Sequence, residues 1–488
     1  MKVLLNTVSA AVLVFVLGAC ATTPPEPVKP EDLPKAFTAP QAAGAEKQIA
    51  AEWWKGFSSP ELTDFVDAAH AGNLDLAAAA ARVEQARAQT GAAWSTLFPA
   101  VDVTGSARRG AAQSIFGTTS TSNTFGLTGS ASYEVDFWGQ AQNNIRAARD
   151  NARAAIYAQD VVQLTTEADV ANTYFTVLAL RERMDIARKN IEAAKRILAI
   201  TQAKVTNGVL SNLELAQQTA QVRSEEAQIP RLEEQEREAR YALAVLLGKM
   251  PEGFDVKGDT LEGISAPPVE PGLPTTILTR RPDVAEAEAG LLAAHANLDA
   301  ARAAFLPAIG LSADGGWQGN AINNLINPGN LVWSIGAQAV ETIFDGGRLT
   351  SQRDLAKARE TELVADYRSA VLNALSDTEA QIGSLASYAE QERLTTDEVA
   401  NAAEAFRISE LQYREGVIDL LTVLQAQQTL FTSQDTLVQI KLARLESNVG
   451  LFRALGGGWT VAADNDKSTR NPFVPVPDLT DLPIGLPF

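Results

Sequence analysis

Cysteine and histidine are almost absent from this sequence of 488 residues. It contains one cysteine, Cys20, and two histidines, His70 and His295, each isolated among residues that favour helices. A single cysteine excludes an intrachain disulfide. The sequence also lacks a Cys/His cluster, a glycine-rich phosphate loop and a nucleophile elbow, which mark common metal, nucleotide and hydrolase sites. We therefore expect no enzyme active site and no metal site, and we expect both histidines to be surface or hydrogen-bonded helix residues.

Basic residues and long apolar runs are also scarce. Lysine and arginine together number 41 against 59 acidic residues, which gives a formal net charge of −18. Because phosphate binding needs clustered basic side chains, we do not expect nucleic acid as a partner. After the N-terminal segment, no apolar stretch is long enough to predict a transmembrane helix.

The N-terminus has the features of an export signal. Lys2 precedes an apolar run from Val3 to Val16, which is too short for a membrane span, and Leu-Gly-Ala-Cys follows at residues 17–20. These four residues match a bacterial lipobox. We predict that residues 1–19 are a signal peptide and that Cys20 carries a covalent lipid, with no other cofactor. Ala21 after the cysteine favours sorting of the lipoprotein to the outer membrane. Outer-membrane lipid is therefore a predicted partner, because each buried methylene of the acyl chains contributes about 0.8 kcal/mol to membrane binding.

The two halves of the chain match each other at a constant offset of about 208 residues. The matching pairs are Leu97-Phe98-Pro99-Ala100 with Phe305-Leu306-Pro307-Ala308, Gly139 with Gly347, Gly208-Val209 with Gly416-Val417, and Leu247-Gly248 with Leu455-Gly456. We predict two copies of one unit, repeat 1 over residues 51–250 and repeat 2 over 251–458. A lipidated N-terminal linker over 20–50 precedes them, and a proline-rich tail over 459–488 follows.

Each repeat contains segments in which apolar and polar residues alternate, as in strands with one apolar face. In repeat 1 the apolar positions after the loop are Phe125, Leu127, Ala131, Tyr133, Val135 and Phe137. We predict β-hairpins over about 98–137 and 306–344, with loops over 111–123 and 318–330 and strands of about the length of a tilted membrane strand. Soluble sandwich strands alternate in the same way, so alternation alone does not establish a membrane sheet.

Four strands per chain are too few for a membrane barrel. The smallest known barrels have about eight strands, and an open edge in lipid costs several kcal/mol per unpaired backbone group. We therefore expect the chain to oligomerise. Strand physics permits two, three or more copies.

A long helix is predicted after each hairpin. Residues 140–207 contain neither glycine nor proline, and residues 348–415 contain only Gly383. Each helix is about 100 Å long if continuous, and each is predicted to end at a glycine, Gly208 or Gly416, in a helical-tip turn. Returning helices over about 209–247 and 417–455 and preceding helices over about 72–96 and 283–304 are expected to stack end to end beside the long ones.

The returning helix of repeat 2 carries a seam of mostly apolar residues at alternating spacings of three and four, which predicts coiled-coil packing. The positions are Leu421, Leu424, Gln428, Phe431, Asp435, Val438, Leu442, Leu445, Val449 and Phe452. An isolated coiled-coil rod has the same pattern. The strand segments between the helices favour a barrel that continues into a helical tube.

Several short runs resemble those of the TolC-like outer membrane factors, most of all their lipoprotein branch. These runs are Trp53-Trp54, the segment from Asn73 to Ala88, Tyr133 to Gly139, Arg280-Arg281-Pro282-Asp283, Ile343 to Arg348, and Tyr413 to Val417. The resemblance implies an α+β membrane protein that forms a homotrimer, with one twelve-stranded β-barrel continued by a periplasmic α-helical barrel. It implies a passive outer-membrane conduit of a tripartite efflux system, lipid-anchored and extending into the periplasm. The implied partners are a periplasmic adaptor and an inner-membrane pump of the RND type.

The closed end of this conduit is predicted at the two helical tips, over residues 209–215 and 417–425, where an adaptor or pump docks. In the resembling family, apolar and acidic rings narrow the tube here. Leu421 matches the apolar ring, whereas Thr422 and Gln425 stand where carboxylates are common, so the acidic ring does not carry over directly. The aperture candidates are Leu213, Glu214, Asp419, Leu421, Thr422 and Gln425. Glu214 and Asp419 are the nearby carboxylates that could replace that ring, and ordinary solvated tip residues are the alternative.

Two other functions remain open from the sequence. A type I secretion outlet uses the same architecture to pass polypeptides, although the lipobox favours export of drugs or small solutes. A non-conducting periplasmic scaffold would need soluble hairpins in place of membrane strands. The sequence does not name the exported substrate, because a wide polar conduit has no dedicated pocket.

Overall fold

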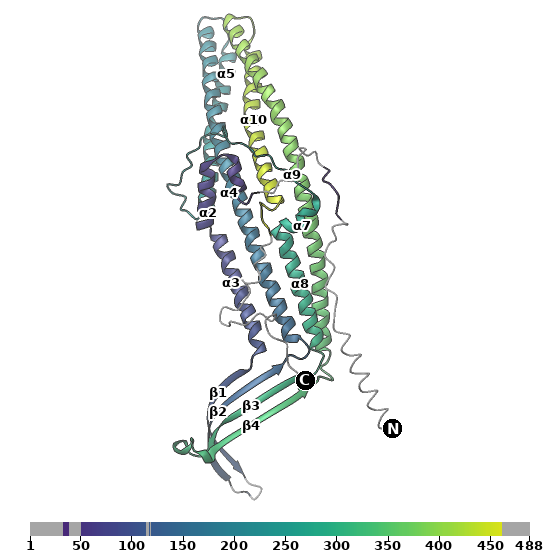
Figure 1. Cartoon of the computed structure of the whole chain (residues 1–488). Coiled ribbons are helices and arrows are strands. Elements are labelled where there is room, and N and C mark those ends of the chain that lie inside the picture. The colour runs from purple at the N-terminus through teal and green to yellow at the C-terminus, as the bar shows by residue number, and fades with distance from the viewer. Residues whose placement is uncertain (1–32, 39–49, 114–116, 118, 461–488) are drawn as a thin grey trace.

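The computed structural model describes residues 33–38, 50–113, 117 and 119–460. Helices form a long rod, and a four-stranded sheet lies at one end of it (Figure 1). The predicted signal peptide, Cys20, most of the linker and nearly all of the tail lie outside the described residues. The account that follows concerns the two repeats.

The sheet contains the strands of both repeats. Its members are β1 (Ala100–Gln113), β2 (Thr119–Val135), β3 (Ala308–Gly319) and β4 (Leu331–Val340), in the order β1-β2-β3-β4 with every pair antiparallel. The predicted loop over 111–123 is too long, because β1 and β2 stay paired as far as Gln113 and Thr119. The Ser/Thr-rich sequence that suggested a loop extends the hairpin instead, since threonine favours strands. The loop between β3 and β4 contains two short 3-10 helices, η5 (Ile322–Asn324) and η6 (Pro328–Asn330).

Two helices run nearly the whole length of the rod: α4 (Gln140–Thr206) with 67 residues and α9 (Arg348–Glu415) with 68. Each begins after a glycine with positive φ, Gly139 at +79° and Gly347 at +92°. An aspartate closes each start. Asp136 accepts hydrogen bonds from the Ala141 and Gln142 N–H groups, and Asp345 accepts them from Gly347 and Leu349. Each helix therefore leaves the sheet through a capped turn.

Shorter helices pack end to end beside the long ones, as the sequence predicts (Figure 1). They are α2 (Pro60–Gly72), α3 (Leu74–Trp94), α5 (Asn212–Glu226), α6 (Gln228–Leu246), α7 (Ile277–Arg280), α8 (Pro282–Ala303) and α10 (Leu420–Ala454), with short 3-10 helices η2 (Trp53–Phe57), η3 (Ser95–Leu97) and η4 (Pro274–Thr276). The structure differs from the predicted helices in two places. An extra helix, α2, precedes the one predicted from 72, and the returning helix of repeat 1 is broken at Ala227. Pro230 explains the break, because proline has no N–H for the carbonyl four residues earlier.

The predicted seam of α10 is confirmed only at the end nearer the middle of the rod. Phe431, Val438, Leu445, Val449 and Phe452 are buried, but Leu421 is 60% exposed and Gln428 is also exposed. Toward the tip the buried stripe lies one position earlier, at Leu420, Val423, Gln427 and Leu430. An α-helix with 3.6 residues per turn drifts by about 20° per heptad against a 3.5-residue repeat. Four heptads of drift amount to nearly one position.

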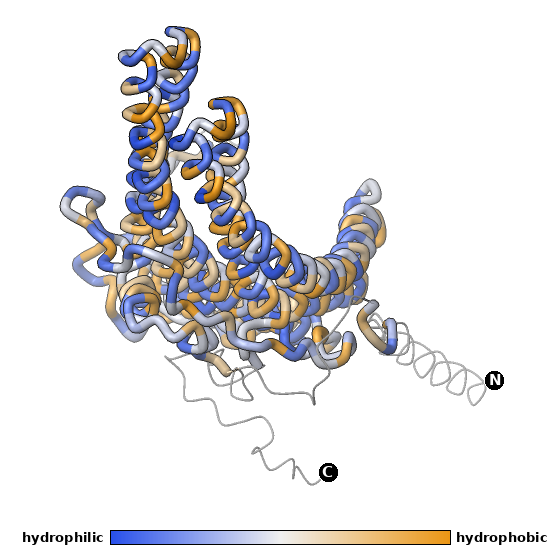
Figure 2. Tube along the Cα trace, turned by 90° about the horizontal axis from the view of Figure 1, so that it is seen from above, coloured by the Kyte–Doolittle hydropathy of each residue, from blue (hydrophilic) through white to orange (hydrophobic). Residues whose placement is uncertain are grey.

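The middle of the rod carries the main apolar core. Trp53, Trp54 and Phe57 of η2 pack with α2, α4 and α10, and the Trp53 ring stacks on Phe452 with ring centroids 5.3 Å apart. Polar and apolar residues alternate along the helices (Figure 2). Among the helices that the structure describes, none is long and apolar enough to cross a membrane.

Candidate conduit surfaces and tip aperture

The strand register sorts the sheet into one apolar and one polar face. Residues paired across strands lie on the same face, and the faces alternate along each strand. The apolar rows include Val101, Val103, Phe125, Leu127, Ala131, Tyr133, Ile309, Leu311, Ala313, Trp317, Leu331, Trp333, Ile335 and Ala337. One row of the opposite face runs Asp102, Ser130, Asp314 and Ser334. The four strands therefore share a single apolar face.

That apolar face is not covered by other described parts of the chain. Trp333 is 73% exposed and Ile335 is 78% exposed. The outer strands β1 and β4 each pair on one side only. A sheet with an uncovered apolar face, a polar opposite face and two open edges matches membrane strands better than a soluble sandwich.

The two tip turns are built from equivalent positions of the repeats. Gly208 has φ +73° and Gly416 has φ +78°, the left-handed conformation that glycine adopts most easily. After each glycine a capping residue starts the returning helix. In repeat 1 the Glu214 carboxylate accepts hydrogen bonds from the Ser211 N–H at 2.6 Å and hydroxyl at 2.5 Å. In repeat 2 the Asp419 carboxylate accepts them from the Thr422 N–H at 2.9 Å and hydroxyl at 2.7 Å.

Two of the predicted aperture residues, Glu214 and Asp419, are therefore the carboxylates of the helix caps. The hydroxyl and N–H of Ser211 hold the pKa of Glu214 below its ordinary value, and those of Thr422 do the same for the pKa of Asp419. Both carboxylates are ionised at neutral pH. Leu213, Leu421, Thr422 and Gln425 are exposed within this chain. Leu213 and Leu421 are equivalent positions, as are the exposed residues Val209 and Val417.

Each repeat has a helical hairpin, formed by α4 with α5 and α6 in repeat 1 and by α9 with α10 in repeat 2. Side chains near the tip connect the two helical hairpins, and sequence reasoning missed these connections. Tyr413 of α9 is fully buried, and its hydroxyl lies 2.8 Å from the Thr201 hydroxyl of α4. Lys204 of α4 donates to the Tyr413 carbonyl, and its ammonium lies 4.4 Å from the Tyr413 ring centroid. The Tyr413 motif is visible in the sequence, but its partners lie more than 200 residues away in the chain. The tip of α9 is thus tied to α4.

A second connection lies farther from the tip. Arg183 of α4 forms two hydrogen bonds with the Asp435 carboxylate of α10, at 2.6 and 3.1 Å. It joins repeat 1 to repeat 2 through partly buried groups. The two hairpins are therefore held together at two levels.

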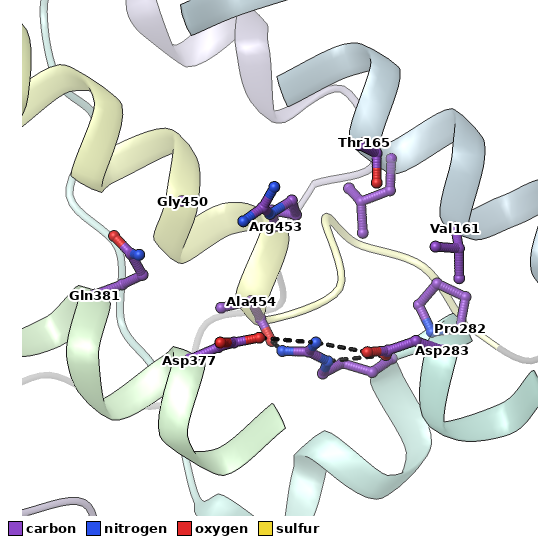
Figure 3. Close-up of a pocket in the computed structure, with 11 residues that line it drawn as sticks. Val161, Thr165, Pro282, Asp283, Asp377, Gln381, Gly450, Arg453 and Ala454 are labelled. Atoms are coloured by element: carbon purple, nitrogen blue, oxygen red, sulfur yellow. Dashed lines mark hydrogen bonds and ion pairs between the residues drawn. The ribbon is translucent and has the colours of Figure 1, made fainter. Parts of the chain in front are cut away.

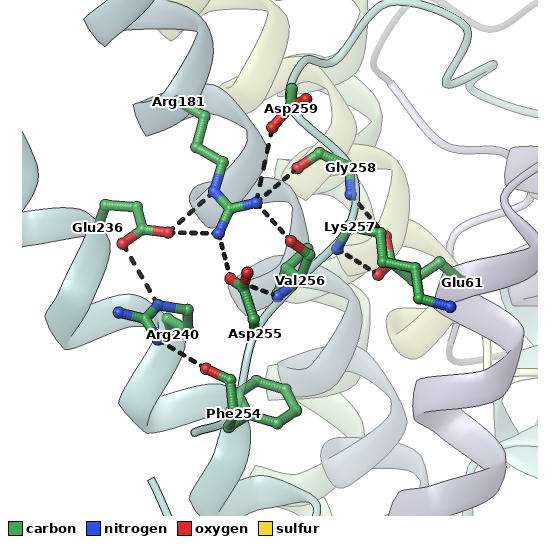
Figure 4. A network of polar contacts seen from close by, with 10 residues as sticks. All are labelled: Glu61, Arg181, Glu236, Arg240, Phe254, Asp255, Val256, Lys257, Gly258 and Asp259. Atoms are coloured by element: carbon green, nitrogen blue, oxygen red, sulfur yellow. Dashed lines mark hydrogen bonds and ion pairs between the residues drawn. The ribbon is translucent and has the colours of Figure 1, made fainter. Parts of the chain in front are cut away.

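The connector between the repeats, residues 248–273, is held against the helices by ion pairs and hydrogen bonds (Figure 4). Arg181 of α4 contacts the Glu236 and Asp255 carboxylates, and it donates to the Val256 and Gly258 carbonyls at 2.5 and 3.0 Å. From the other side, Glu61 of α2 accepts from the Lys257 and Gly258 N–H groups. This network fastens the connector to α2, α4 and α6.

A cavity of about 200 Å³ lies where the end of α10 meets the start of α8 (Figure 3). Its wall includes Arg281, a residue 8% exposed. The Arg281 guanidinium donates to the Ala454 carbonyl at 3.0 Å, and it pairs with Asp283 at 2.6 Å and with Asp377 at 3.4 Å. These partners satisfy the charge, so the site is a brace between helices.

Both histidines are hydrogen-bonded helix residues, as predicted. His70 of α2 lies 2.9 Å from a Glu167 carboxylate oxygen of α4, and His295 of α8 lies 2.6 Å from Glu360 of α9. The hydrogen bond with Glu167 raises the pKa of His70. Within the part of the chain that the structure describes, no group of three or more His, Cys, Asp or Glu residues is arranged to hold a metal.

Comparison with known proteins agrees with this geometry. The family model described as "Outer membrane efflux protein" matches residues 65–249 and 273–457, two segments that begin 208 residues apart. The chain is 39% identical over 467 residues to the pyoverdine export outer membrane protein OpmQ of Pseudomonas aeruginosa, covering 93% of this chain and 97% of OpmQ. It is 30% identical over 482 residues to the probable efflux pump outer membrane protein TtgC of Pseudomonas putida, covering 96% and 99%. The solved outer-membrane channel OprN superposes with a TM-score of 0.81 at 27% identity, over 90% of this chain and 100% of that one.

Proposed function

The chain belongs to the outer membrane efflux protein family and is an outer-membrane efflux channel component, and we propose that three copies of it form one closed conduit. The family consists of transport proteins with a mostly helical fold and a few strands. For this chain we propose a passive conduit without catalysis. Energy for export would come from a pump in the inner membrane.

The observation that carries the proposal is the sheet, with its single apolar face and two open edges. In lipid, open strand edges leave backbone groups unpaired at several kcal/mol each, so β1 of one copy must pair with β4 of another. Three copies supply twelve strands, an even number within the range of known membrane barrels. The apolar rows then face lipid, and the row containing Asp102 and Asp314 faces the lumen.

The proposed partners meet the tips. Because each long helix extends about 100 Å from the sheet, the turns at Gly208 and Gly416 lie deepest in the periplasm. Val209, Leu213, Val417 and Leu421 expose apolar surface there. We propose that a periplasmic adaptor contacts these turns and that an RND-type pump lies beyond it.

The tips also form the proposed aperture. Three copies of Leu421, with Leu213 nearby, would narrow the lumen, and the Glu214 and Asp419 carboxylates would attract cations to its entrance. Thr422 and Gln425 would leave the family's usual acidic positions uncharged. Opening would require the hairpins to separate, which breaks the hydrogen bond between Tyr413 and Thr201.

A lipid on Cys20 would add a second membrane attachment. Cys20→Ala should lose the lipid and keep the protein in the outer membrane, because the sheet holds the membrane independently. The measurement is fractionation of cells that express the variant. A variant found only in the soluble periplasmic fraction would rule out the membrane sheet.

We favour small solutes over polypeptides as the exported cargo. The names of the two relatives refer to pyoverdine export and to an efflux pump, and neither refers to protein secretion. Copurification tests the choice, because an RND-type pump is expected with this chain. A secretion-type inner-membrane transporter as the main partner would favour the polypeptide outlet.

Conductance in planar bilayers tests the conduit itself. The purified protein should insert as a trimer and pass ions. A stable trimer that never conducts, under any voltage or after tip substitutions, would leave the periplasmic scaffold as the better account.

A further inference from the structure

A polar cleft separates the two helical hairpins where the returning helix of repeat 1 is broken. It has a volume of about 280 Å³ and lies among α4, α5, α6 and α10. Its polar wall includes Arg183, Asn190, Gln221, Glu225, Gln228, Gln428 and Asp435. The break at Ala227 places the end of α5 and the start of α6 on the same wall.

Glu225 is the unusual member of this wall. The residue is 7% exposed, and its two carboxylate oxygens accept hydrogen bonds from the neutral amides of Gln221 and Gln228, each at 2.8 Å. No basic side chain of the described chain lies within ion-pair distance of it. A buried carboxylate without a cation is costly in its ionised form. Burial accordingly raises the pKa of Glu225.

The charges that face Glu225 do not compensate for it. Across the cleft, Arg183 of α4 is engaged with Asp435 of α10. The other charges nearby are paired elsewhere: the adjacent Glu226 contacts Arg223 and Lys195, and Arg188 of α4 contacts Glu233 of α6. Within the described chain, the Glu225 carboxylate is therefore stabilised by the two glutamine amides alone and by no cation.

Unsatisfied amides in the same part of the rod indicate that this packing is not the most stable arrangement for every group. Asn190 is 7% exposed and lines the cleft. Gln427 is fully buried, and neither its amide nitrogen nor its oxygen has a partner among the described residues. A buried polar group without a partner costs free energy that hydration would recover. Separation of the hairpins would hydrate these amides.

We propose that the Glu225 carboxyl in this cleft is a proton-binding site that controls how tightly the two hairpins pack. The idea rests on the proposed closed tip. When Glu225 is protonated, its carboxyl is neutral and the hairpins stay packed. When it loses the proton, a buried charge without a counterion favours the separated, hydrated state. Because protonation favours the packed state, packing is strongest at low pH and weakens as pH rises through the pKa of Glu225 in the packed state.

Repeat 2 and the neighbouring residue supply matched controls. The position equivalent to Glu225 is Ser433, which is buried and donates to the Leu430 carbonyl. Glu226 is the next carboxylate along α5, and its partners lower its pKa. Glu225→Gln imitates the protonated state, Glu225→Ser imitates repeat 2, and Glu226→Gln removes a charge outside the cleft.

Amide hydrogen exchange measured by mass spectrometry tests the proposal without requiring conductance. Rates for peptides covering residues 212–235 are compared between variants at each pH from 5 to 8, so that intrinsic exchange cancels. At pH 8 the wild type should exchange roughly three to ten times faster than Glu225→Gln, and this ratio should fall as the pH is lowered toward 5. Glu225→Ser should behave like Glu225→Gln, and Glu226→Gln should follow the wild type.

Two results would overturn the proposal. One is the same ratio of wild-type to Glu225→Gln exchange at every pH, and the other is a Glu226→Gln profile that matches Glu225→Gln. A pH-dependent ratio in a protein that does not conduct would uphold the proton site and refute the proposed conduit.

Discussion

Asn73 in repeat 1 and Arg281 in repeat 2 occupy equivalent positions, 208 residues apart. Each side chain joins the start of a short helix to the end of the returning helix in its repeat, and we call this contact the junction. The two junctions use different donor groups. The Asn73 amide donates to the Leu246 carbonyl at 2.8 Å, and the Arg281 guanidinium donates to the equivalent Ala454 carbonyl at 3.0 Å. Asn73 also caps α3 by accepting from the Asp75 and Leu76 N–H groups. The repeats thus preserve the acceptor carbonyl and the contact, while the donor side chain differs.

The glycines beside these junctions are less replaceable than the side chains. A Cβ added to Gly248 would lie 2.0 Å from the Gly72 carbonyl oxygen, and one added to Gly456 would lie 1.8 Å from the Arg280 carbonyl oxygen. Gly72 and Arg280 are again equivalent positions. Close approach of two backbones specifies the residue more strictly than a hydrogen bond does.

The returning helices show where the repeats diverge. Pro230 breaks the helix in repeat 1, and its equivalent in repeat 2 is Val438, which is buried within the continuous helix α10. The break creates the cleft that holds Glu225. Backbone geometry is therefore shared at the junctions and tips, and the differences gather between them.

The largest effect is expected at the two junction glycines. Gly248→Ala and Gly456→Ala each combine a left-handed backbone with a clash against a carbonyl, which together cost about 3 to 5 kcal/mol. Thermal unfolding of the purified protein, followed by helical circular dichroism, should show similar losses for both. Gly263→Ala is the control, because it shares the positive φ but has open space around it. A severe loss in only one repeat would break the comparison between junctions.

Equivalent positions on the apolar sheet face should respond alike as well. Leu127→Arg and Ile335→Arg place a charge in lipid and should reduce membrane insertion by roughly 2 to 4 kcal/mol near the bilayer midplane. Thr128→Arg lies on the polar face and should be tolerated. Insertion is measured by folding into lipid vesicles with a denaturant titration. Equal tolerance at both faces would refute the assignment of lipid and lumen.

The junction side chains should give smaller losses. Asn73→Ala removes a helix cap and a bond to a buried carbonyl, at about 1 to 2 kcal/mol. Arg281→Ala should cost a similar amount, because its partners Asp283 and Asp377 remain partly exposed to water. Arg281→Asn should be milder in thermal unfolding, since asparagine serves this role in repeat 1. If asparagine were no better than alanine, the two donors would not be interchangeable.

The smallest effect is expected from the caps at the tips. The pKa of Glu214 and that of Asp419 are both lowered, so each cap stabilises its turn above the ordinary carboxyl pKa of about 4 and is lost as pH falls below it. Ser211→Ala removes the cap of the repeat 1 tip, and Asp419→Ala removes the cap of the repeat 2 tip. Below that pH, hydrogen exchange in each wild-type tip turn should accelerate and approach the rate of the variant that lacks its cap. If the ratio of wild-type to variant exchange rates at a tip stayed constant down to pH 3, the carboxylate at that tip would not stabilise the turn.

Much of this architecture could be predicted because it follows from local rules. The repeat offset, the alternating strands, the long glycine-free helices and the tip glycines are all visible in one dimension. The missed helix α2 also had a local signal, since Ser59 caps it and Pro60 occupies its first turn. Pro230 is likewise a local signal for the break between α5 and α6.

Other features needed the third dimension. Tyr413 forms a hydrogen bond with Thr201, and Arg181 forms hydrogen bonds with the connector. Both contacts join residues that are far apart in the sequence. The burial of α10 near the tip depends on helix drift over about four heptads, which a heptad template hides. The carboxylates proposed for the aperture were identifiable, but their role as helix caps became apparent only from their hydrogen bonds.

Single-channel conductance of the Leu421→Ser/Glu214→Gln double variant tests most directly whether the tips close the conduit. The account predicts larger conductance than the wild type, because the apolar constriction is weakened, together with a lower preference for cations. Leu74→Ser, an exposed leucine at the start of α3, should change neither property. Wild-type conductance and selectivity in the double variant would contradict the account and place the constriction elsewhere in the tube.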